Sequence, residues 1–207
     1  MRVLLSTQQS LGRVILGQVS WLSLLVFLSV ACQPLVATTP LPTRIDQPTI
    51  PHATLVYYDI SGTTDGELRA QLDRLGPTGY DNYKGDAATT WYIAWQWPND
   101  PDGSCRLSET VVSYAITVTL PHWNPPTEAS NDLIVRWNEY LTALTEHEKG
   151  HVALVLANLP NVEQAIKGAT CAMANAVGER QLAEIRSHDI DFDRTTNHGI
   201  AQGATFP

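Results

Sequence analysis

The chain has 207 residues, with 13 Lys and Arg against 21 Asp and Glu, and a formal net charge of −8. This length allows one domain with appendages, and an apolar fraction of 43% with 6 Trp is enough for a core, which excludes wholesale disorder. The acidic balance argues against a nucleic-acid partner, which needs a basic face, and 3 Cys are too few for a disulfide scaffold.

The first 31 residues have the pattern of an export signal. Arg2 and Arg13 precede an uncharged run over 14–31, which ends at Leu28-Ser-Val-Ala-Cys32. This ending resembles the bacterial lipobox, whose cysteine becomes the lipidated first residue, although Ser29 stands where Leu is commoner. A retained membrane anchor is the alternative, since 18 uncharged residues approach a spanning length. We predict a lipoprotein-type signal peptide over 1–31, lipidation at Cys32 and an exported protein attached to a membrane of the bacterial cell envelope.

A tether follows the predicted cleavage point. Residues 33–51 hold 5 of the 13 prolines and four threonines, and they show no apolar periodicity. Such a composition is typical of a semi-extended linker. We therefore expect a Pro- and Thr-rich tether over 32–51 and one folded domain over 52–207.

The first half of this domain reads as strands with one short helix. Residues 53–60 are β-branched and aromatic, and residues 89–97 and 111–120 alternate between apolar and polar positions, which predicts three strands. Thr64 followed by Glu67 fits a capping box, so a helix should begin there and stop at Gly76-Pro77. The strand over 111–120 was also a candidate for pairing with an extended peptide as an added strand.

From residue 125 the apolar period changes to that of a helix. A long helix is expected to run to Asn158-Leu-Pro160, where proline should interrupt it, and another helical region is expected over 162–186. Gly168 and Gly178 are weak points in that region, and the tail over 189–207 has no period. Strands first and helices last predict an α+β domain, with a small antiparallel or mixed sheet followed by two long helices.

The strongest chemical signal is Glu146-His-Glu-Lys-Gly-His151, which contains His-Glu-x-x-His. On a helix, residues four apart lie on the same face, so His147 and His151 can bind one metal ion, with Glu148 beside it to polarise a water. A pair of surface histidines on a charged helix face is the plainer interpretation. Gly150 inside the helix costs about 1 kcal/mol against alanine, so a close approach of another segment is expected there.

A hydrolytic zinc site needs a third protein ligand and an open position for water. Leu154 and Ala157 stand where the extended metzincin motif has Gly and His, which excludes that subclass. Four side chains remained open as the third ligand: Glu179, Glu184, His188 and His198.

The sequence after the tether resembles a bacterial family of uncharacterised domains described as predicted secreted zinc-dependent proteases. The resemblance covers nearly all of this part of the chain, and its two specific elements are His147-Glu-Lys-Gly-His151 and Asp193-Arg-Thr-Thr-Asn-His198-Gly199. Further matching positions are Tyr58-Asp-Ile-Ser-Gly-Thr63, Glu67-Leu68, Thr90-Trp91, Trp95, Cys105, Thr119-Leu-Pro-His-Trp123 and Cys171. The resemblance implies a zincin-like fold and a metal site, and its second element favours His198 as the third ligand.

Two cysteines remain once Cys32 is lipidated. In an oxidising envelope Cys105 and Cys171 should form one disulfide, with zinc binding as the rival interpretation. This disulfide would tie the loop after the second strand to the helical half of the domain.

These observations predict an envelope-attached zinc metallohydrolase, most simply a peptidase acting on a peptide or protein. His147, His151 and His198 would hold Zn²⁺, and Glu148 would act as general base. Arg194, Tyr114 and His188 were considered as the second stabiliser of the oxyanion. The alternative is a non-catalytic zinc-containing lipoprotein that binds a peptide or a partner, for which an intact Glu148 has no use.

Overall fold

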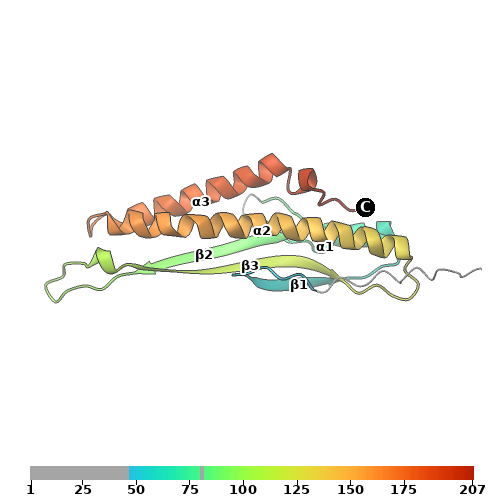
Figure 1. Cartoon of the computed structure of the whole chain (residues 1–207), viewed down its shortest axis with the longest axis horizontal. Coiled ribbons are helices and arrows are strands. Elements are labelled where there is room, and N and C mark those ends of the chain that lie inside the picture. Colours follow the sequence, from blue (N-terminus) through green and yellow to red (C-terminus); the bar gives the residue numbers. More distant parts are fainter. Residues whose placement is uncertain (1–46, 80–81) are drawn as a thin grey trace, which may run out of the picture. The chain divides into compact units, whose positions relative to one another are not determined.

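The computed structural model describes residues 47–79 and 82–207. The predicted signal peptide, the predicted lipidation site Cys32 and most of the predicted tether lie outside these residues. The described elements are three strands, three α-helices and two short 3₁₀ turns (Figure 1). Their bounds, in chain order, are β1 Thr54–Ile60, α1 Asp65–Leu75, β2 Ala88–Gln96, η1 Leu107–Glu109, β3 Val111–Trp123, α2 Asn131–Lys167, α3 Ala174–Thr196 and η2 Ile200–Gln202.

The three strands form one mixed sheet in the order β1-β3-β2. β1 runs parallel to β3, with Leu55 opposite Val118, and β2 runs antiparallel to β3, with Trp91 opposite Ile116. The predicted α+β class and the small mixed sheet are therefore confirmed. β3 is the central strand, but β1 pairs with it only over 117–123, so one edge of β3 is open over residues 111–116 among the described residues. The suggestion that β3 accepts an added peptide strand therefore stays a prediction for that stretch.

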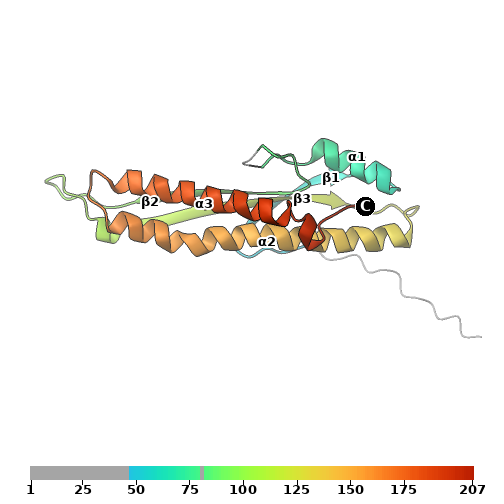
Figure 2. The same cartoon turned by 90° about the horizontal axis from the view of Figure 1, so that it is seen from above.

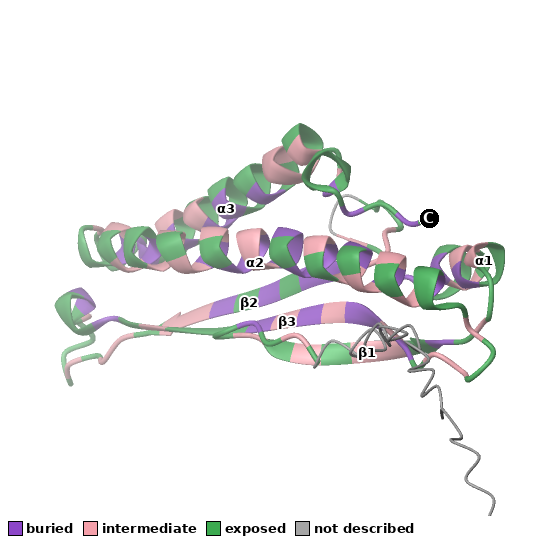
Figure 3. Cartoon of the chain, turned by 45° about the vertical axis from the view of Figure 1, so that its right-hand side comes forward, coloured by how far each residue is buried: buried purple, intermediate pink, exposed green. Residues whose placement is uncertain are grey.

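The sheet is covered by helices on one face and is open on the other (Figures 1 and 3). Ile116, Val118 and Leu120 of β3 are buried, whereas Thr117 and Thr119 between them are half-buried. The predicted alternation is confirmed over 116–120, but Tyr114, which the same pattern placed on the inner face, is exposed. The core lies between β3, β2 and the inner face of α2.

Helix α1 begins and ends where the sequence predicts. Thr64 accepts a hydrogen bond from the Glu67 backbone N–H, and the Glu67 carboxylate accepts one from the Thr64 backbone N–H, which completes the capping box. The helix stops before Gly76, and Leu68 and Leu72 bury its inner face.

Helix α2 is longer than the sequence predicted, because Pro160 does not interrupt it. The helix begins after the Ser130 N-cap and continues to Lys167. Val155, Val162 and Ile166 are fully buried on either side of the proline, and this burial holds the two halves in line. Pro160 itself is exposed, so solvent can hydrate the carbonyl that loses its intrahelical hydrogen bond.

Helix α3 also departs from the predicted boundaries. The break between the two helices falls at 168–173, next to Gly168, and Gly178 lies inside α3. The helix then runs through Asp189 to Thr196, a segment that we had predicted to be a non-periodic tail. The buried face of α3 carries Asp189 where an apolar residue would be expected. The helical period of apolar residues is therefore not visible in this part of the sequence.

Two glycines allow close packing in the helical layer. A Cβ atom at Gly150 of α2 would lie 2.5 Å from Cζ of Phe192, and one at Gly178 of α3 would lie 2.7 Å from Cζ2 of Trp95. The close approach expected at Gly150 is therefore present, and Phe192 of α3 makes it.

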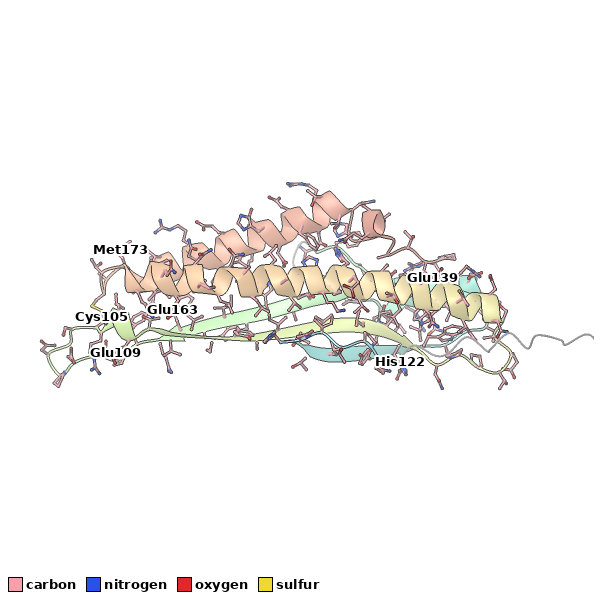
Figure 4. All side chains as sticks on the ribbon, in the orientation of Figure 1. Cys105, Glu109, His122, Glu139, Glu163 and Met173 are labelled. Carbon is pink, nitrogen blue, oxygen red and sulfur yellow. A yellow bond between two sulfur atoms is a disulfide. The ribbon has the colours of Figure 1, made fainter. Side chains whose placement is uncertain are left out.

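The two cysteines are joined in a disulfide. Cys105, between β2 and η1, is bonded to Cys171, between α2 and α3, with Cα atoms 5.8 Å apart. Figure 4 shows Cys105 at the end of the molecule where Met173 also lies. The bond thus ties the β2–β3 connection to the turn between the two long helices, as the sequence predicted.

Removing the disulfide should destabilise the domain measurably. The bridge closes a loop with a sequence separation of 66 residues. For a loop of that size the chain-entropy relation gives roughly 4 kcal/mol, and native bridges in small secreted domains contribute about 2–5 kcal/mol. We expect Cys105→Ser/Cys171→Ser to lose stability in that range in guanidinium unfolding. Reduced wild type should match the double variant. Two alkylatable thiols in the folded wild-type protein would contradict the pairing.

Gly150→Ala should destabilise the domain, although alanine is the better helix former. The new methyl group meets the Phe192 ring, and overpacking of this kind costs about 1–3 kcal/mol. Gly66→Ala in α1 is the matched control because its Cβ meets nothing within 4 Å, and it should be neutral or stabilising by up to about 1 kcal/mol. Thermal unfolding compares the two, and Phe192→Leu should relieve the Gly150→Ala defect. Equal melting of both glycine variants would show that the contact carries no energy.

Candidate metal centre

Three side chains from two helices converge on one point. His147 and His151 are one turn apart on α2, and Asp193 is on α3, which packs against α2 (Figure 2). Asp193 Oδ1 lies 3.1 Å from His147 Nε2 and 3.0 Å from His151 Nε2, and the two Nε2 atoms are 3.2 Å apart. This group could hold a metal ion.

The spacing of these atoms fits a tetrahedral ion. Zinc binds nitrogen and oxygen at about 2.0–2.2 Å, which places tetrahedral ligand atoms about 3.4 Å from one another. The three observed separations of 3.0–3.2 Å are slightly shorter, so a small outward shift would admit the ion. Two imidazoles and one carboxylate also leave a fourth position, which a catalytic site needs.

The second nitrogen of each histidine is fixed by an acceptor. His151 Nδ1 lies 2.6 Å from Asp189 Oδ1, and His147 Nδ1 lies 2.8 Å from Gln202 Oε1. Donation from Nδ1 leaves each Nε2 with a lone pair directed at the centre of the site. Asp189 is buried and also accepts from Trp91 Nε1 at 3.4 Å. These contacts are the outer shell that metal-binding histidines usually have.

An aromatic ring completes the packing of the two histidines. Phe192 stacks on His147 with centroids 5.1 Å apart and meets His151 edge-on at 4.8 Å. The ring that requires Gly150 to lack a side chain is therefore the one that holds both imidazoles in place. The glycine in the His-Glu-x-Gly-His segment is explained by this contact.

Burial and hydrogen bonding shift the pKa values of His151 and Asp193 in opposite directions. Burial opposes the charged form of His151, but hydrogen bonds to Asp189 and Asp193 outweigh it and raise its pKa to about 10. Burial likewise favours a raised pKa for Asp193, but the hydrogen bonds from His147 and His151 bring that pKa well below its usual range.

Glu148 lies beside the three ligand atoms and is held from the sheet. It is 3% exposed, and its Oε2 accepts a hydrogen bond from Thr89 Oγ1 of β2 at 2.6 Å. Burial raises the pKa of the Glu148 carboxyl, and the nearby His151 and the Thr89 hydroxyl limit the rise. A carboxylate with a raised pKa is a better proton acceptor near neutral pH.

These residues line one cavity of about 440 Å³. One wall is made by His147, Glu148 and His151 of α2, and another by Ala88 and Thr89 of β2. Helix α1, the last turns of α3, the loop before β2 and the chain after α3 supply the rest of the lining, which includes Tyr83, His198 and Phe206. A volume of this size is in the range of small-molecule and peptide side-chain pockets.

Of the four side chains proposed as the third ligand, only His198 lines the cavity. His198 lines the cavity, but its Nδ1 is 3.8 Å from Asp193 Oδ1, and it is not in the group that could hold an ion. Glu179, Glu184 and His188 are exposed on α3 and do not line the cavity. Among the described residues, the group that could hold an ion contains Asp193 and none of these four side chains, and His198 as the third ligand stays a prediction.

Sequence reasoning missed Asp193, Asp189 and Gln202. Asp189 and Asp193 are four residues apart, the same spacing as the two histidines, and this repeat was the available signal. Because residues 189–196 show no apolar period, the sequence predicts a tail there, whereas these residues form the last turns of α3. Gln202 and Thr89 carry no pattern in the sequence, since only tertiary contacts bring them to the site.

No helix among the described residues is long and apolar enough to cross a membrane. No curated protein and no solved structure matches the chain. One family model does match, over residues 55–199, and it is described as a bacterial protein of unknown function, DUF922. The matched range contains all three ligand residues and Glu148. The chain therefore belongs to the DUF922 family of bacterial proteins.

Proposed function

We propose that this protein is a zinc-dependent hydrolase of zincin type, most simply a peptidase. The observation that carries the proposal is the convergence of His147, His151 and Asp193 on one point, with the buried Glu148 beside them at the wall of a cavity. The helical His-Glu-x-x-His arrangement favours zinc, whereas the same ligand set on other scaffolds also binds iron. A zinc ion bound there would make a water more acidic and would polarise a carbonyl group.

The chain's own residues would move the proton. Thr89 holds Oε2 of Glu148, so Oε1 remains to accept a proton from the attacking water. The same carboxyl group can then release the proton to the leaving amine. Burial of Glu148 excludes bulk water from this transfer, and it also keeps the proton affinity of the carboxylate above that of an exposed glutamate.

The free edge of the sheet supports a peptide as the substrate. β2 is an edge strand among the described residues, and its Ala88 and Thr89 line the cavity next to Glu148. An extended peptide can hydrogen-bond to an open strand edge of this kind. The sheet would then place a scissile carbonyl beside the centre. The open edge of β3 over 111–116 does not line the cavity.

Export is part of the proposal. The Cys105–Cys171 disulfide supports an oxidising compartment, because such bonds are rare in the bacterial cytosol. The predicted lipid on Cys32 would hold the domain at a membrane surface. We expect full-length wild type to partition into the detergent phase and Cys32→Ser to stay in the aqueous phase. Identical partitioning of the two forms would rule out lipidation at this cysteine.

Metal content and hydrolysis together test the function. Wild type should hold about one zinc per chain, because the three proposed ligands converge on one point. It should also cleave members of a broad peptide library, because the proposed base Glu148 lies beside them. His147→Ala and Asp193→Ala should lose metal and activity. Glu148→Gln should keep the metal and lose hydrolysis by several orders of magnitude, since it removes only the proton acceptor. Elemental analysis and mass spectrometry of the library measure the two quantities.

The same variants identify a wrong assignment. Glu184→Ala is the matched control, because this exposed glutamate of α3 lies outside the cavity and should not alter metal or activity. Full metal retention by Asp193→Ala would remove Asp193 from the ligand set. Iron in place of zinc would overturn the metal assignment. A wild type that holds zinc, cleaves nothing and matches Glu148→Gln throughout would instead indicate a non-catalytic binding module.

A further inference from the structure

Hydrolysis of an amide builds negative charge on the carbonyl oxygen, and a positioned donor besides the metal stabilises that charge. The three residues that the sequence offers as this donor, Arg194, His188 and Tyr114, do not suit the role. Arg194 has a side chain that is 70% exposed and pairs with Asp191 at 2.7 Å. His188 is exposed, Tyr114 is 40% exposed, and neither of them lines the cavity. The donor must come from another part of the cavity wall.

His198 is a cavity-lining side chain with unused hydrogen-bonding capacity. Its side chain is 26% exposed, and its Nδ1 lies 3.8 Å from Asp193 Oδ1, which is too long for a hydrogen bond. Its imidazole makes no hydrogen bond to any residue in the described part of the chain. Because a neutral imidazole always carries one N–H group, His198 can donate to a molecule in the cavity beside the metal ligands.

The backbone holds His198 in an unusual conformation. Asn197, His198 and Gly199 have φ of 49°, 51° and 82°, so three successive residues adopt left-handed backbone. Such a conformation is unfavourable at the two non-glycine positions, and it persists only where surrounding contacts impose it. The Asn197 and His198 N–H groups bond back to the end of α3, to Arg194 and Asp193 carbonyls, which supplies part of that constraint.

Packing fixes the position of this turn relative to the metal ligands. A Cβ at Gly199 would lie 3.0 Å from Cγ of His147, so the turn rests directly on a ligand ring. On the other side, Tyr83 stacks on the His198 imidazole with centroids 3.8 Å apart and planes inclined by 10°. The loop before β2 therefore stacks on the ring of His198, while the next residue of the turn rests on His147.

We infer that His198 is a substrate-contacting donor, which stabilises the negative charge that develops on the scissile carbonyl oxygen, and that Tyr83 is the positioning residue that orients its ring. This inference rests on the proposed function, and it assigns a role to His198 other than that of a metal ligand. It accounts for a histidine that lines the cavity without joining the ligand group. It also accounts for the constrained turn, because a preorganised donor needs no rearrangement during the reaction.

The test compares wild type, His198→Ala and His198→Gln, with His188→Ala as the matched control on the exposed side of α3. Loss of one oxyanion donor lowers kcat by about 100- to 1000-fold, so His198→Ala should fall in that range with KM nearly unchanged and one zinc per chain retained. His198→Gln, which restores an N–H donor, should recover at least tenfold of the loss. His188→Ala should match wild type. Tyr83→Ala removes the stacked ring and should lose part of kcat with one zinc per chain retained.

A second readout does not depend on turnover. The phosphinic analogue of trialanine carries a tetrahedral anionic group, and its Kd is measured by calorimetry on the zinc-loaded proteins. We expect His198→Ala to bind it at least tenfold more weakly than wild type, and His198→Gln to bind it with intermediate affinity. If wild type cleaves no peptide but this pattern of binding holds, the peptidase proposal fails while the donor role of His198 stands. Loss of zinc in His198→Ala, or equal analogue binding by wild type and His198→Ala, overturns the inference.

Discussion

The contact on which the structure depends is the one between the carboxylates of α3 and the histidines of α2. Asp189 and Asp193 hold His151 from both of its ring nitrogens, and Asp193 also reaches His147. With Glu148, the cluster contains three carboxylates and two imidazoles, so even double protonation of the histidines leaves a formal charge of −1. Burying such a set without a cation is costly, because each unpaired buried charge carries a large desolvation penalty. A positive ion bound between His147, His151 and Asp193, the group that could hold one, would offset this negative charge.

The same contact explains why two long helices pack where they do. Each helix presents a pair of polar residues four positions apart. The histidine pair of α2, His147 and His151, lies against the aspartate pair of α3, Asp189 and Asp193. Phe192 lies between the two aspartates in sequence and fills the space that Gly150 leaves open. Hydrophobic packing and ligand positioning thus use the same turn of α3. At the far end of the helix pair, the Cys105–Cys171 bond fixes the turn, so the helices are held at both ends.

The elements that the sequence predicted well are those whose pattern is local. The capping box of α1, the alternation of β3 and the histidine pair of α2 all depend on residues within a few positions of one another. The errors lie where a distant partner changes the local preference. Pro160 remains helical because Val155, Val162 and Ile166 are buried around it. The last turns of α3 form because Asp189 has buried partners in β2 and α2, which no count of apolar residues could reveal.

The chain after α3 connects the site to the core. Gln202 of η2 orients His147, Gly199 packs on the same ring, and Phe206 inserts among Trp137 and Tyr140 of α2. Arg69 of α1 donates a hydrogen bond to the Phe206 carbonyl at 3.1 Å and forms a salt bridge with Asp86, which also accepts from Tyr140. Two separate anchors, one at the ligand ring and one in the aromatic core, therefore fix the short segment between them. Because His198 belongs to the segment anchored at the ligand ring, its position relative to the metal ligands is set by the folded core rather than by the loop's own preference. This attached segment forms part of the wall of the cavity at the candidate metal centre.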